Sequence, residues 1–297
     1  MIIVRLRGGL GNQMFQYALG RRLALENHTP LKLDTSEYKT TIKREYKLNH
    51  FNIAGDVASK EEVEQVTGSN KPSLERILYK LKIGTRPYYE RRVVQERVVG
   101  FDPRIMNVRP AVYLDGYWQS EKYFSVIGDT LRRDFTLRQG LSREGESIAR
   151  GMLDSQSVSI HVRRGDYVTD PIYQRLHGLC PLSYYIEAIG RFERLLDEPR
   201  FFVFSDDLSW ARDNLELRNA ATFVDQKETA TDCEDLILMS YCKNHIIANS
   251  SFSWWGAWLS ANKGGLVLAP SMWFKDERVT PKDLIPESWQ RIKTSLI

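Results

Sequence analysis

Cysteine is scarce in this sequence of 297 residues. Three are present, Cys180, Cys233 and Cys242, and no two of them form a CxxC pair. An odd and widely spaced set argues against a disulfide framework and against a structural zinc site. We therefore expect reduced thiols, a cytoplasmic location and no structural metal.

Long hydrophobic runs and strong charge are absent as well. The longest apolar candidate, HIIANSSFSWWGAWL, is interrupted by Asn249, Ser250 and Ser251, whereas a membrane-spanning helix needs about 20 mostly apolar residues. The opening letters MIIVRL indicate a strand rather than a secretion signal. The formal net charge of +4 suits anionic ligands, or peripheral contact with the inner face of the cytoplasmic membrane, and is too small to indicate nucleic-acid binding.

The chain opens with the pattern of a strand, a glycine-rich turn and a helix. Residues 2–6 are mostly apolar, residues 7–13 read RGGLGNQ, and apolar residues then recur at steps of three and four through residues 14–26. This pattern predicts a strand and a helix with one buried face, and a second strand follows at residues 31–33.

The glycine-rich turn does not complete a dinucleotide-binding fingerprint. Met14 stands where a third glycine would allow close approach of helix and strand. Two interpretations stay open. Either the glycines form only a tight turn, or the amides of Gly9 and Gly11 and the side chains of Asn12 and Gln13 bind a phosphate or a sugar hydroxyl.

The stretch YLDGYWQSEKYF, residues 113–124, interleaves aromatic and polar residues. Sugars stack their apolar ring faces on aromatic side chains while polar groups bind the hydroxyls. We therefore expect a sugar-binding wall formed by Asp115, Tyr117, Trp118 and Gln119. The alternative is that these aromatic rings belong to the core.

Strands and helices alternate regularly in the second half of the chain. Strands are expected at residues 157–162, 201–204, 222–224, 245–248 and 266–269, and helices at residues 181–196, 208–215, 231–242 and 252–261. Thr231 and Glu234 fit a capping box at the start of the third of these helices. This alternation indicates a parallel, doubly wound sheet.

The secondary-structure pattern is weaker at residues 36–108, where we expect helices at residues 61–66 and 74–81. A linker and helix at residues 131–151 suggest a domain boundary. We predict an α/β protein of two facing Rossmann-like domains, residues 1–150 and 151–297, with a cleft between them.

Two guanidinium groups follow the strand in SVSIHVRRGDYV, residues 157–168. Ligands bind at the carboxyl edge of open α/β sheets, and a guanidinium matches phosphate oxygens in geometry and charge. Arg163 and Arg164 therefore predict a phosphate site. The alternative is a solvated cluster in which the arginines pair with Asp166.

Two more polar loops follow strands and should open on the same edge, the Ser-Asp-Asp loop at residues 205–207 and the Asn-Ser-Ser loop at residues 249–251. The second leads directly into a helix, whose first amides can bind pyrophosphate. Adjacent carboxylates can also hold a divalent metal, but here the arginines already supply positive charge. We expect one of Asp206 and Asp207 to accept hydrogen bonds from a base or ribose, and the alternative for the other is a helix cap before Leu208.

Six blocks of the sequence together resemble one family. They read RLRGGLGNQMFQYALGRRLA, YLDGYWQSEKYF, HVRRGDYV, CPLSYYIEAI, VFSDDLSWA and NSSFSWWGAWL. In this order they resemble the bacterial α-1,2-fucosyltransferases of glycosyltransferase family 11, over essentially the whole length. The HxRRxD pattern is shared more widely among inverting fucosyltransferases of GT-B fold.

The resemblance implies a GT-B-like fold and the transfer of L-fucose, with inversion and without a metal. The donor would be GDP-β-L-fucose, bound by the domain at residues 151–297. The acceptor would be the 2-hydroxyl of a terminal galactose in a glycan, either free or lipid-linked as in O-antigen synthesis, on the side of residues 1–150.

The resemblance also implies roles for single residues. Arg163 would grip the departing β-phosphate, Asp166 would orient the arginines, and Asn12 would reach the donor phosphate or the reacting hydroxyl. The implied donor-binding set is His161, Arg163, Arg164, Ser205, Asp206, Asp207, Asn249, Ser250, Ser251, Phe252, Gly9 and Gly11. The general base stays open between Asp166, Asp115, Asp34, Glu45 and no protein base at all.

Rival functions are a noncatalytic carbohydrate- or nucleotide-binding protein on the same scaffold, a fucosyltransferase of another regiospecificity, and a metal-dependent transferase that uses Asp206 and Asp207. The paired arginines together with Asn12 favour an enzyme, because a protein that only binds its ligand does not need these residues placed around reacting atoms.

Overall fold

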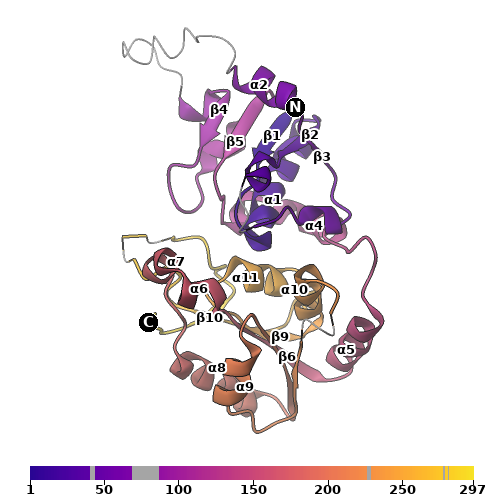
Figure 1. The fold of residues 1–297 in the computed structure, drawn as a ribbon, viewed down its shortest axis with the longest axis vertical. Helices are drawn as coiled ribbons and strands as arrows, with labels where there is room; N and C mark the ends of the chain where they lie inside the picture. The colour runs from indigo at the N-terminus through magenta and orange to yellow at the C-terminus, as the bar shows by residue number, and fades with distance from the viewer. Residues whose placement is uncertain (41–43, 69–86, 226–228, 277, 280) are drawn as a thin grey trace. The chain divides into compact units, whose positions relative to one another are not determined.

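The computed structural model describes residues 1–40, 44–68, 87–225, 229–276, 278–279 and 281–297. The chain forms two compact units. Unit 1 consists of Met1–Phe135 and Lys282–Leu284, and unit 2 of Thr136–Pro281 and Ile285–Ile297. Each unit contains one parallel sheet with helices on it, which confirms the predicted α/β class (Figure 1).

The units divide after Phe135 and not after residue 150, because α5 (Arg143–Leu153) is held by unit 2. The buried Glu234 carboxylate accepts a hydrogen bond from the backbone N–H of Ser142, the N-cap of α5, at 2.6 Å. A second N–H, that of Ala230, donates to the other oxygen of Glu234 at 2.7 Å. A helix fixed in this way belongs to the unit that holds its first turn.

The same contacts correct the predicted capping box. Thr231 does cap α10 (Asp232–Tyr241) by accepting from the N–H of Glu234. The Glu234 side chain, however, accepts from the N–H of Ala230 and not from that of Thr231, and its other oxygen accepts from Ser142.

Unit 1 is built on a five-stranded parallel sheet in the order β3-β2-β1-β5-β4. Its strands are β1 (Ile2–Arg5), β2 (Leu31–Asp34), β3 (Asp56–Val57), β4 (Val93–Gln95) and β5 (Val112–Asp115). The α-helices among its described residues are α1 (Leu10–Glu26), α2 (Lys60–Thr67) and α4 (Gly128–Asp134). Short 3-10 helices lie at Ser36–Lys39, Leu48–His50, Tyr88–Glu90, Pro103–Asn107, Glu121–Tyr123 and Ser125–Ile127.

The helix expected at residues 61–66 is α2, which Ser59 and Glu62 begin with a complete capping box. The helix expected at residues 74–81 lies outside the described residues.

Helix α1 differs from its prediction in two ways. It begins at Leu10, so Asn12 and Gln13 lie in its first turn, and 12 of its 17 residues are buried instead of a single face. The close approach of helix and strand, for which the fingerprint position holds Met14 and no glycine, depends on Gly20. A Cβ on Gly20 would stand 2.4 Å from Val4 Cγ2 in β1, far inside van der Waals contact.

Unit 2 contains a six-stranded parallel sheet in the order β11-β10-β9-β6-β7-β8. Its strands are β6 (Gln156–Val162), β7 (Pro199–Ser205), β8 (Ala221–Phe223), β9 (Asn244–Ile246), β10 (Val267–Pro270) and β11 (Gln290–Ile292). The five predicted strands are present, and β11 is an addition that the sequence pattern did not reveal.

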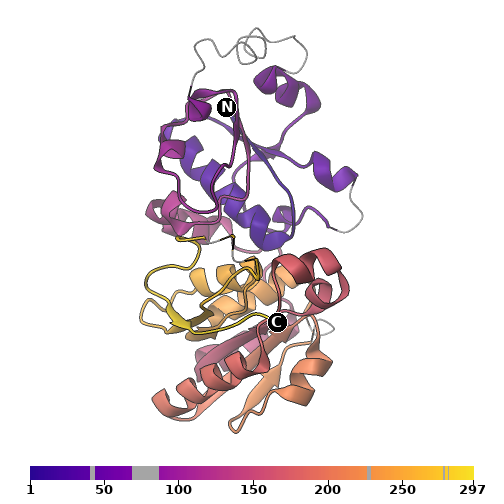
Figure 2. The ribbon, with the colours of Figure 1, turned by 90° about the vertical axis from the view of Figure 1, so that its left-hand side faces the viewer.

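Helices cover both faces of this sheet (Figures 1 and 2). Helices α8 (Leu182–Leu195) and α9 (Leu208–Asn214) follow β6 and β7, whereas α10 and α11 (Ser251–Trp258) precede and follow β9. Right-handed crossovers in this strand order place the first pair on one face and the second pair on the other. The short helices α6 (Gly165–Thr169) and α7 (Pro171–Leu176) were not predicted.

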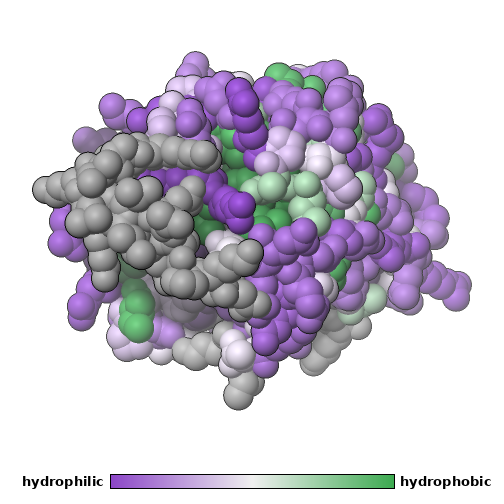
Figure 3. All heavy atoms as spheres, turned by 90° about the horizontal axis from the view of Figure 1, so that it is seen from above, coloured by the Kyte–Doolittle hydropathy of each residue, from purple (hydrophilic) through white to green (hydrophobic). Residues whose placement is uncertain are grey.

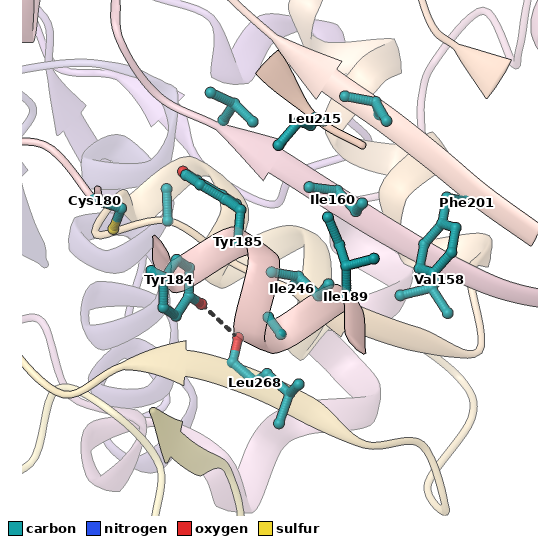
Figure 4. Packing of buried hydrophobic residues seen from close by; sticks show 14 of the residues in the cluster. Val158, Ile160, Cys180, Tyr184, Tyr185, Ile189, Phe201, Leu215, Ile246 and Leu268 are labelled. Carbon is teal, nitrogen blue, oxygen red and sulfur yellow. Dashed lines mark hydrogen bonds between the residues drawn. The ribbon is translucent and has the colours of Figure 1, made fainter. Parts of the chain in front are cut away.

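The core under α8 is mostly apolar, and the buried hydroxyls of Tyr184 and Tyr185 bond to backbone carbonyls within it (Figure 4). Ile160, Ile189 and Ile246 meet there from a helix and two strands. The buried Tyr184 hydroxyl lies within hydrogen-bond distance of the carbonyls of Ile247, at 2.6 Å, and Leu268, at 3.1 Å. This core fixes the strands whose ends carry the polar loops.

Hydrophilic residues dominate the face of the molecule drawn in Figure 3, with hydrophobic residues gathered near its middle. In the part of the chain that the structure describes, no helix is both long and apolar enough to cross a membrane.

Candidate functional site

The two arginines lie directly after β6, beside the end of β7, as predicted. Arg163 forms ion pairs with Asp166, in the next helix, and with Asp206 at 2.9 Å. Arg164 pairs with Asp207 at 3.0 Å, and its backbone N–H donates to Asp206 at 2.8 Å. The two loops are thus joined into one cluster of two guanidinium and three carboxylate groups, which we call the arginine cluster.

Gly165 makes this cluster possible. A Cβ at Gly165 would lie 2.4 Å from the Asp206 carboxylate, so any side chain there would displace the acid that bridges both arginines. The glycine of the RRGD sequence therefore serves close packing.

Charge and ring contacts hold both guanidinium groups. Burial opposes the charge of Arg163, but Asp206 and Asp166 outweigh it, and the pKa of Arg163 is raised. Its guanidinium lies 5.3 Å from the centre of the Tyr167 ring, and that of Arg164 lies 4.2 Å from the centre of the Trp210 ring. Such contacts fix a guanidinium without consuming its N–H donors.

The Asp206 and Asp207 side chains face the arginines. Asp207 also caps α9 by accepting from the N–H of Trp210, so the helix-cap interpretation is confirmed for it. The pKa of Asp207 is lowered, chiefly by this hydrogen bond from Trp210 and further by the Arg164 guanidinium. Ser205 accepts from the N–H of Asp207 at 2.9 Å and so shapes the loop. Within the described residues, no three His, Cys, Asp or Glu side chains gather as a metal site.

The start of α11 offers amide groups beside a buried histidine. Ser250 is the N-cap, and its side chain makes no capping hydrogen bond. Phe252, in the first turn, has its ring centre 5.4 Å from that of His161. Burial, with Arg163 nearby, lowers the pKa of His161 to about 3, so the imidazole is neutral, and its buried Nδ1 has no partner in the described chain. Together with Ser251, these groups suit a polar, anionic ligand.

Asn249 does not have the free side chain that donor binding requires. It is buried, and its amide nitrogen lies within hydrogen-bond distance of the carbonyls of His177, Gly178 and Trp273. Its side-chain oxygen accepts from the Cys180 thiol. Because its neighbours already use both ends of the amide, Asn249 anchors the loop after α7.

Sequence reasoning missed a cluster of four rings beside Arg163. Tyr167, Tyr173 and His177 lie in α6, α7 and the residue after it, and Phe274 comes from far along the chain. Tyr173 and His177 are four residues apart, a helical spacing, but that spacing does not include Tyr167, and only the fold brings Phe274 to them.

In unit 1 the glycine-rich segment forms part of α1. Gly9 is its N-cap and Gly11 is buried in its first turn. The Asn12 side-chain oxygen accepts from Gln119 at 2.7 Å. Gln13 is fully buried and binds the backbone carbonyl of Glu45 at 2.8 Å and the N–H of Lys47 at 2.9 Å. Asn12 therefore stays a candidate for ligand binding, whereas Gln13 is structural.

The expected sugar-binding wall is only partly exposed. Tyr117 is exposed, with the Arg7 guanidinium 4.5 Å from its ring centre, and Asp115 pairs with Arg7 and Arg5 at 3.5 Å each. Trp118 is instead buried in the core, with its ring against Tyr123, as the alternative interpretation held.

Glu96 is a further residue that the sequence did not reveal. Its carboxylate accepts from the backbone N–H groups of Tyr117, at 2.7 Å, and Trp118, at 3.0 Å. These bonds hold Trp118 in a left-handed conformation with φ of 56°. Burial is the leading cause of the raised pKa of Glu96.

Two of the candidate general bases have clear surroundings. Asp34 is buried, accepting from the Tyr113 hydroxyl at 2.6 Å and from the N–H of Ser36 at 2.9 Å. Glu45 is exposed. A carboxylate already bound on both oxygens is a poor acceptor for a substrate proton, which disfavours Asp34.

Comparison with known proteins adds to this geometry. A model of a family described as glycosyl transferase family 11 matches residues 1–293. The chain is 36% identical to the alpha-1,2-colitosyltransferase of Escherichia coli over 296 residues, 99% of each protein. It is 32% identical to the O-antigen biosynthesis glycosyltransferase WbnK of Escherichia coli, covering 96% of this chain and 98% of WbnK. It is 29% identical to human galactoside alpha-(1,2)-fucosyltransferase 1, over 51% of this chain and 44% of the human protein.

Among solved structures, the chain is similar to Arabidopsis thaliana FUT1 in complex with GDP. The TM-score is 0.54 at 13% sequence identity, covering 97% of this chain and 75% of that one. This likeness concerns the fold, which is GT-B-like as predicted.

Proposed function

The chain belongs to glycosyl transferase family 11, and from that premise we propose that it transfers L-fucose from GDP-β-L-fucose to the 2-hydroxyl of a terminal galactose, with inversion. The acceptor is a glycan, free or lipid-linked as in O-antigen synthesis. The protein works in the cytoplasm, with peripheral contact to the inner face of the membrane where the acceptor is lipid-linked.

The arginine cluster is the observation that supports this proposal. Negative charge builds on the GDP diphosphate as the glycosidic bond breaks, so fixed guanidinium groups bind the transition state more tightly than the ground state. Asp166 and Asp206 engage Nη2 and Nη1 of Arg163 and hold it in place before any ligand arrives. A guanidinium has five N–H donors and can bind carboxylates and phosphate at once.

The amides at the start of α11 and the neutral His161 complete the proposed donor site in unit 2. The amides suit the diphosphate, and an unpartnered imidazole nitrogen suits a hydrogen bond to the nucleoside. We assign the acceptor to unit 1, where Asn12, Asp115, Tyr117 and Gln119 lie around the start of α1 and the end of β5.

The test is the Arg163→Ala variant in an assay of GDP release from GDP-fucose with lactose as acceptor. Removing one such charge contact costs about 2.7–4 kcal/mol, so we expect a loss of about a hundred- to a thousandfold in kcat. The control is Arg191→Ala, which removes a partly exposed arginine of α8 whose ion pair, within the described residues, is with its helix neighbour Glu187. Retained turnover in a folded Arg163→Ala protein would eliminate the proposed role.

The same assay with excess EDTA tests the proposal that no metal takes part. Both Asp206 and Asp207 bind arginines, so we expect undiminished activity. Loss of activity, restored by added Mg²⁺ or Mn²⁺, would favour the metal-dependent rival. A protein that binds GDP and lactose without turnover would be the noncatalytic rival.

A colitosyl donor is the second candidate, because the colitosyltransferase is similar over 99% of both chains. Parallel assays with the two GDP-linked sugars, followed by linkage analysis of the product, decide the donor, the regiospecificity and the anomeric outcome. A glycan array then identifies the preferred acceptor.

A further inference from the structure

Four neighbouring rings, those of Tyr167, Tyr173, His177 and Phe274, form what we call the aromatic wall beside the arginine cluster. The ring centres of Tyr167 and His177 are 4.8 Å apart with planes within 11°, and those of Tyr173 and His177 are 6.0 Å apart within 22°. Phe274 extends the set, 5.2 Å from His177. Tyr173, His177 and Phe274 are partly exposed, so the wall offers apolar ring surface to a ligand.

The position of the wall relative to Arg163 points to its ligand. Tyr167 carries the Arg163 guanidinium 5.3 Å from its ring centre, and both Arg163 and Asp166 act electrostatically on His177. In a nucleotide sugar, the sugar is bonded directly to the phosphate that Arg163 is proposed to hold. Rings that neighbour Arg163 are therefore within reach of that sugar.

We propose that the aromatic wall binds the apolar side of the donor sugar and selects a 6-deoxyhexose over its 6-hydroxylated counterpart. This inference rests on the proposed function. A methyl group packs against ring faces, whereas a hydroxyl at the same carbon loses its hydrogen bonds to water without gaining equal ones.

The wall also has one polar atom. The buried Nδ1 of His177 has no partner among the described residues, and burial lowers the pKa of this histidine to about 4, so the ring is neutral at pH 7. It can orient a ring hydroxyl that both sugars share. An apolar surface with a single polar group is typical of a site that recognises a sugar with few hydroxyls.

The experiment compares GDP-L-fucose with GDP-L-galactose, which differ only by the hydroxyl at C6. GDP release with lactose as acceptor gives kcat/KM for each donor. An apolar pocket discriminates against one added hydroxyl by up to about a hundredfold, and we expect the wild-type protein to prefer GDP-L-fucose by about ten- to a hundredfold. Tyr173→Ala and His177→Ala should each reduce this ratio several-fold or more, while the dissociation constant of GDP, which carries no sugar, stays within about twofold of wild type.

Matched variants keep the test specific. Ile172→Ala changes a neighbouring residue of α7 that is 75% exposed and should leave the ratio unchanged. Tyr173→Phe and His177→Phe retain a ring and should keep the preference. Thermal melting and GDP binding verify that each variant is folded.

The outcomes separate the two proposals. If the wild-type protein releases GDP from GDP-L-fucose but the alanine variants keep its donor ratio, the aromatic wall is overturned and the proposed function stands. A wild-type ratio near one also overturns the wall. If the wild-type protein releases GDP from neither donor, the proposed function fails, and the inference fails with it.

Discussion

Arg163 and Arg164 share one acid, Asp206, so a change at Asp206 affects the positions of both arginines. Asp206 pairs with the side chain of Arg163 and accepts from the backbone of Arg164. The sequence predicted that the two arginines and the polar loops at residues 205–207 and 249–251 lie together, because each follows a strand. It could not predict which carboxylate meets which arginine, because Asp206 and Asp207 lie more than forty positions away and their directions depend on the loop after β7.

Asn249 and Trp118 were predicted to bind ligands, and the structure shows that both are buried. Both carry the right chemistry in the right block, yet both are buried with neighbours that only the fold supplies. Asn249 meets the carbonyls of His177 and Trp273, and Trp118 meets the ring of Tyr123. Residue type and order in the chain do not distinguish a buried polar anchor from a ligand.

Glu96 leads to a prediction about the acceptor. Glu96→Ala removes the acceptor of two backbone hydrogen bonds, so the Tyr117 turn should loosen and Tyr117 should leave its contact with Arg7. We expect KM for lactose to rise about tenfold, equivalent to about 1.4 kcal/mol, with GDP affinity unchanged. Glu90→Ala, at an exposed glutamate of the same unit, is the control. Weaker GDP binding with an unchanged KM for lactose would contradict the assignment.

Among the helices and strands, length and alternation decided what was predictable. The strands β6 and β7 have seven residues each and a dense apolar pattern. By contrast, β3, β4 and β11 have two or three residues with half or more of each exposed or partly exposed, and α6 and α7 are one or two turns long. Elements this short carry little periodic signal, although β8, also three residues long and without a buried residue, was expected at residues 222–224. The aromatic wall depends on α6 and α7.

Gly20 leads to a prediction about α1. Gly20→Ala inserts a methyl group where the nearest atom of Val4 stands 2.4 Å away and one of Leu31 stands 2.9 Å away. Overpacking of this kind costs about 1–3 kcal/mol, although alanine favours a helix by up to about 1 kcal/mol over glycine. We expect a net loss in the free energy of unfolding, measured with urea. Gly190→Ala in α8, where the nearest foreign atom is the movable end of Arg194 at 3.3 Å, should stabilise or be neutral.

For the chain as a whole, the two parallel sheets followed from the alternation of strands and helices, whereas the division between units did not. The division depends on a carboxylate at position 234 that holds a helix starting more than ninety residues earlier. Long-range contacts of this kind leave no local trace in a sequence.

Three histidines with lowered pKa values, two of them buried and His177 partly exposed, give the whole protein a pH dependence. Burial lowers the pKa of His161 and of His245 to about 3 and that of His177 to about 4. An unfolded imidazole binds a proton near pH 6.5. Between pH 6.5 and about 5 the unfolded state therefore binds more protons than the folded state, and stability must fall as the pH falls, by up to about 1.4 kcal/mol per pH unit for each histidine.

Urea unfolding at pH 7.5, 6.0 and 5.0 measures this slope. His245→Asn should reduce the slope by one histidine's share, because the asparagine does not titrate. A free energy of unfolding that is constant from pH 7.5 to 5.0 would contradict the prediction.

Gly165 limits which substitutions the loop after β6 can accept during evolution. One added methyl group there would strike Asp206 and so disturb the supports of Arg163 and Arg164 together. Variation that keeps both arginines can still disable the proposed anion site by this route, whereas the rings around Tyr173 are free to diversify. We therefore expect new donor preferences to arise among those rings and not within the RRGD turn.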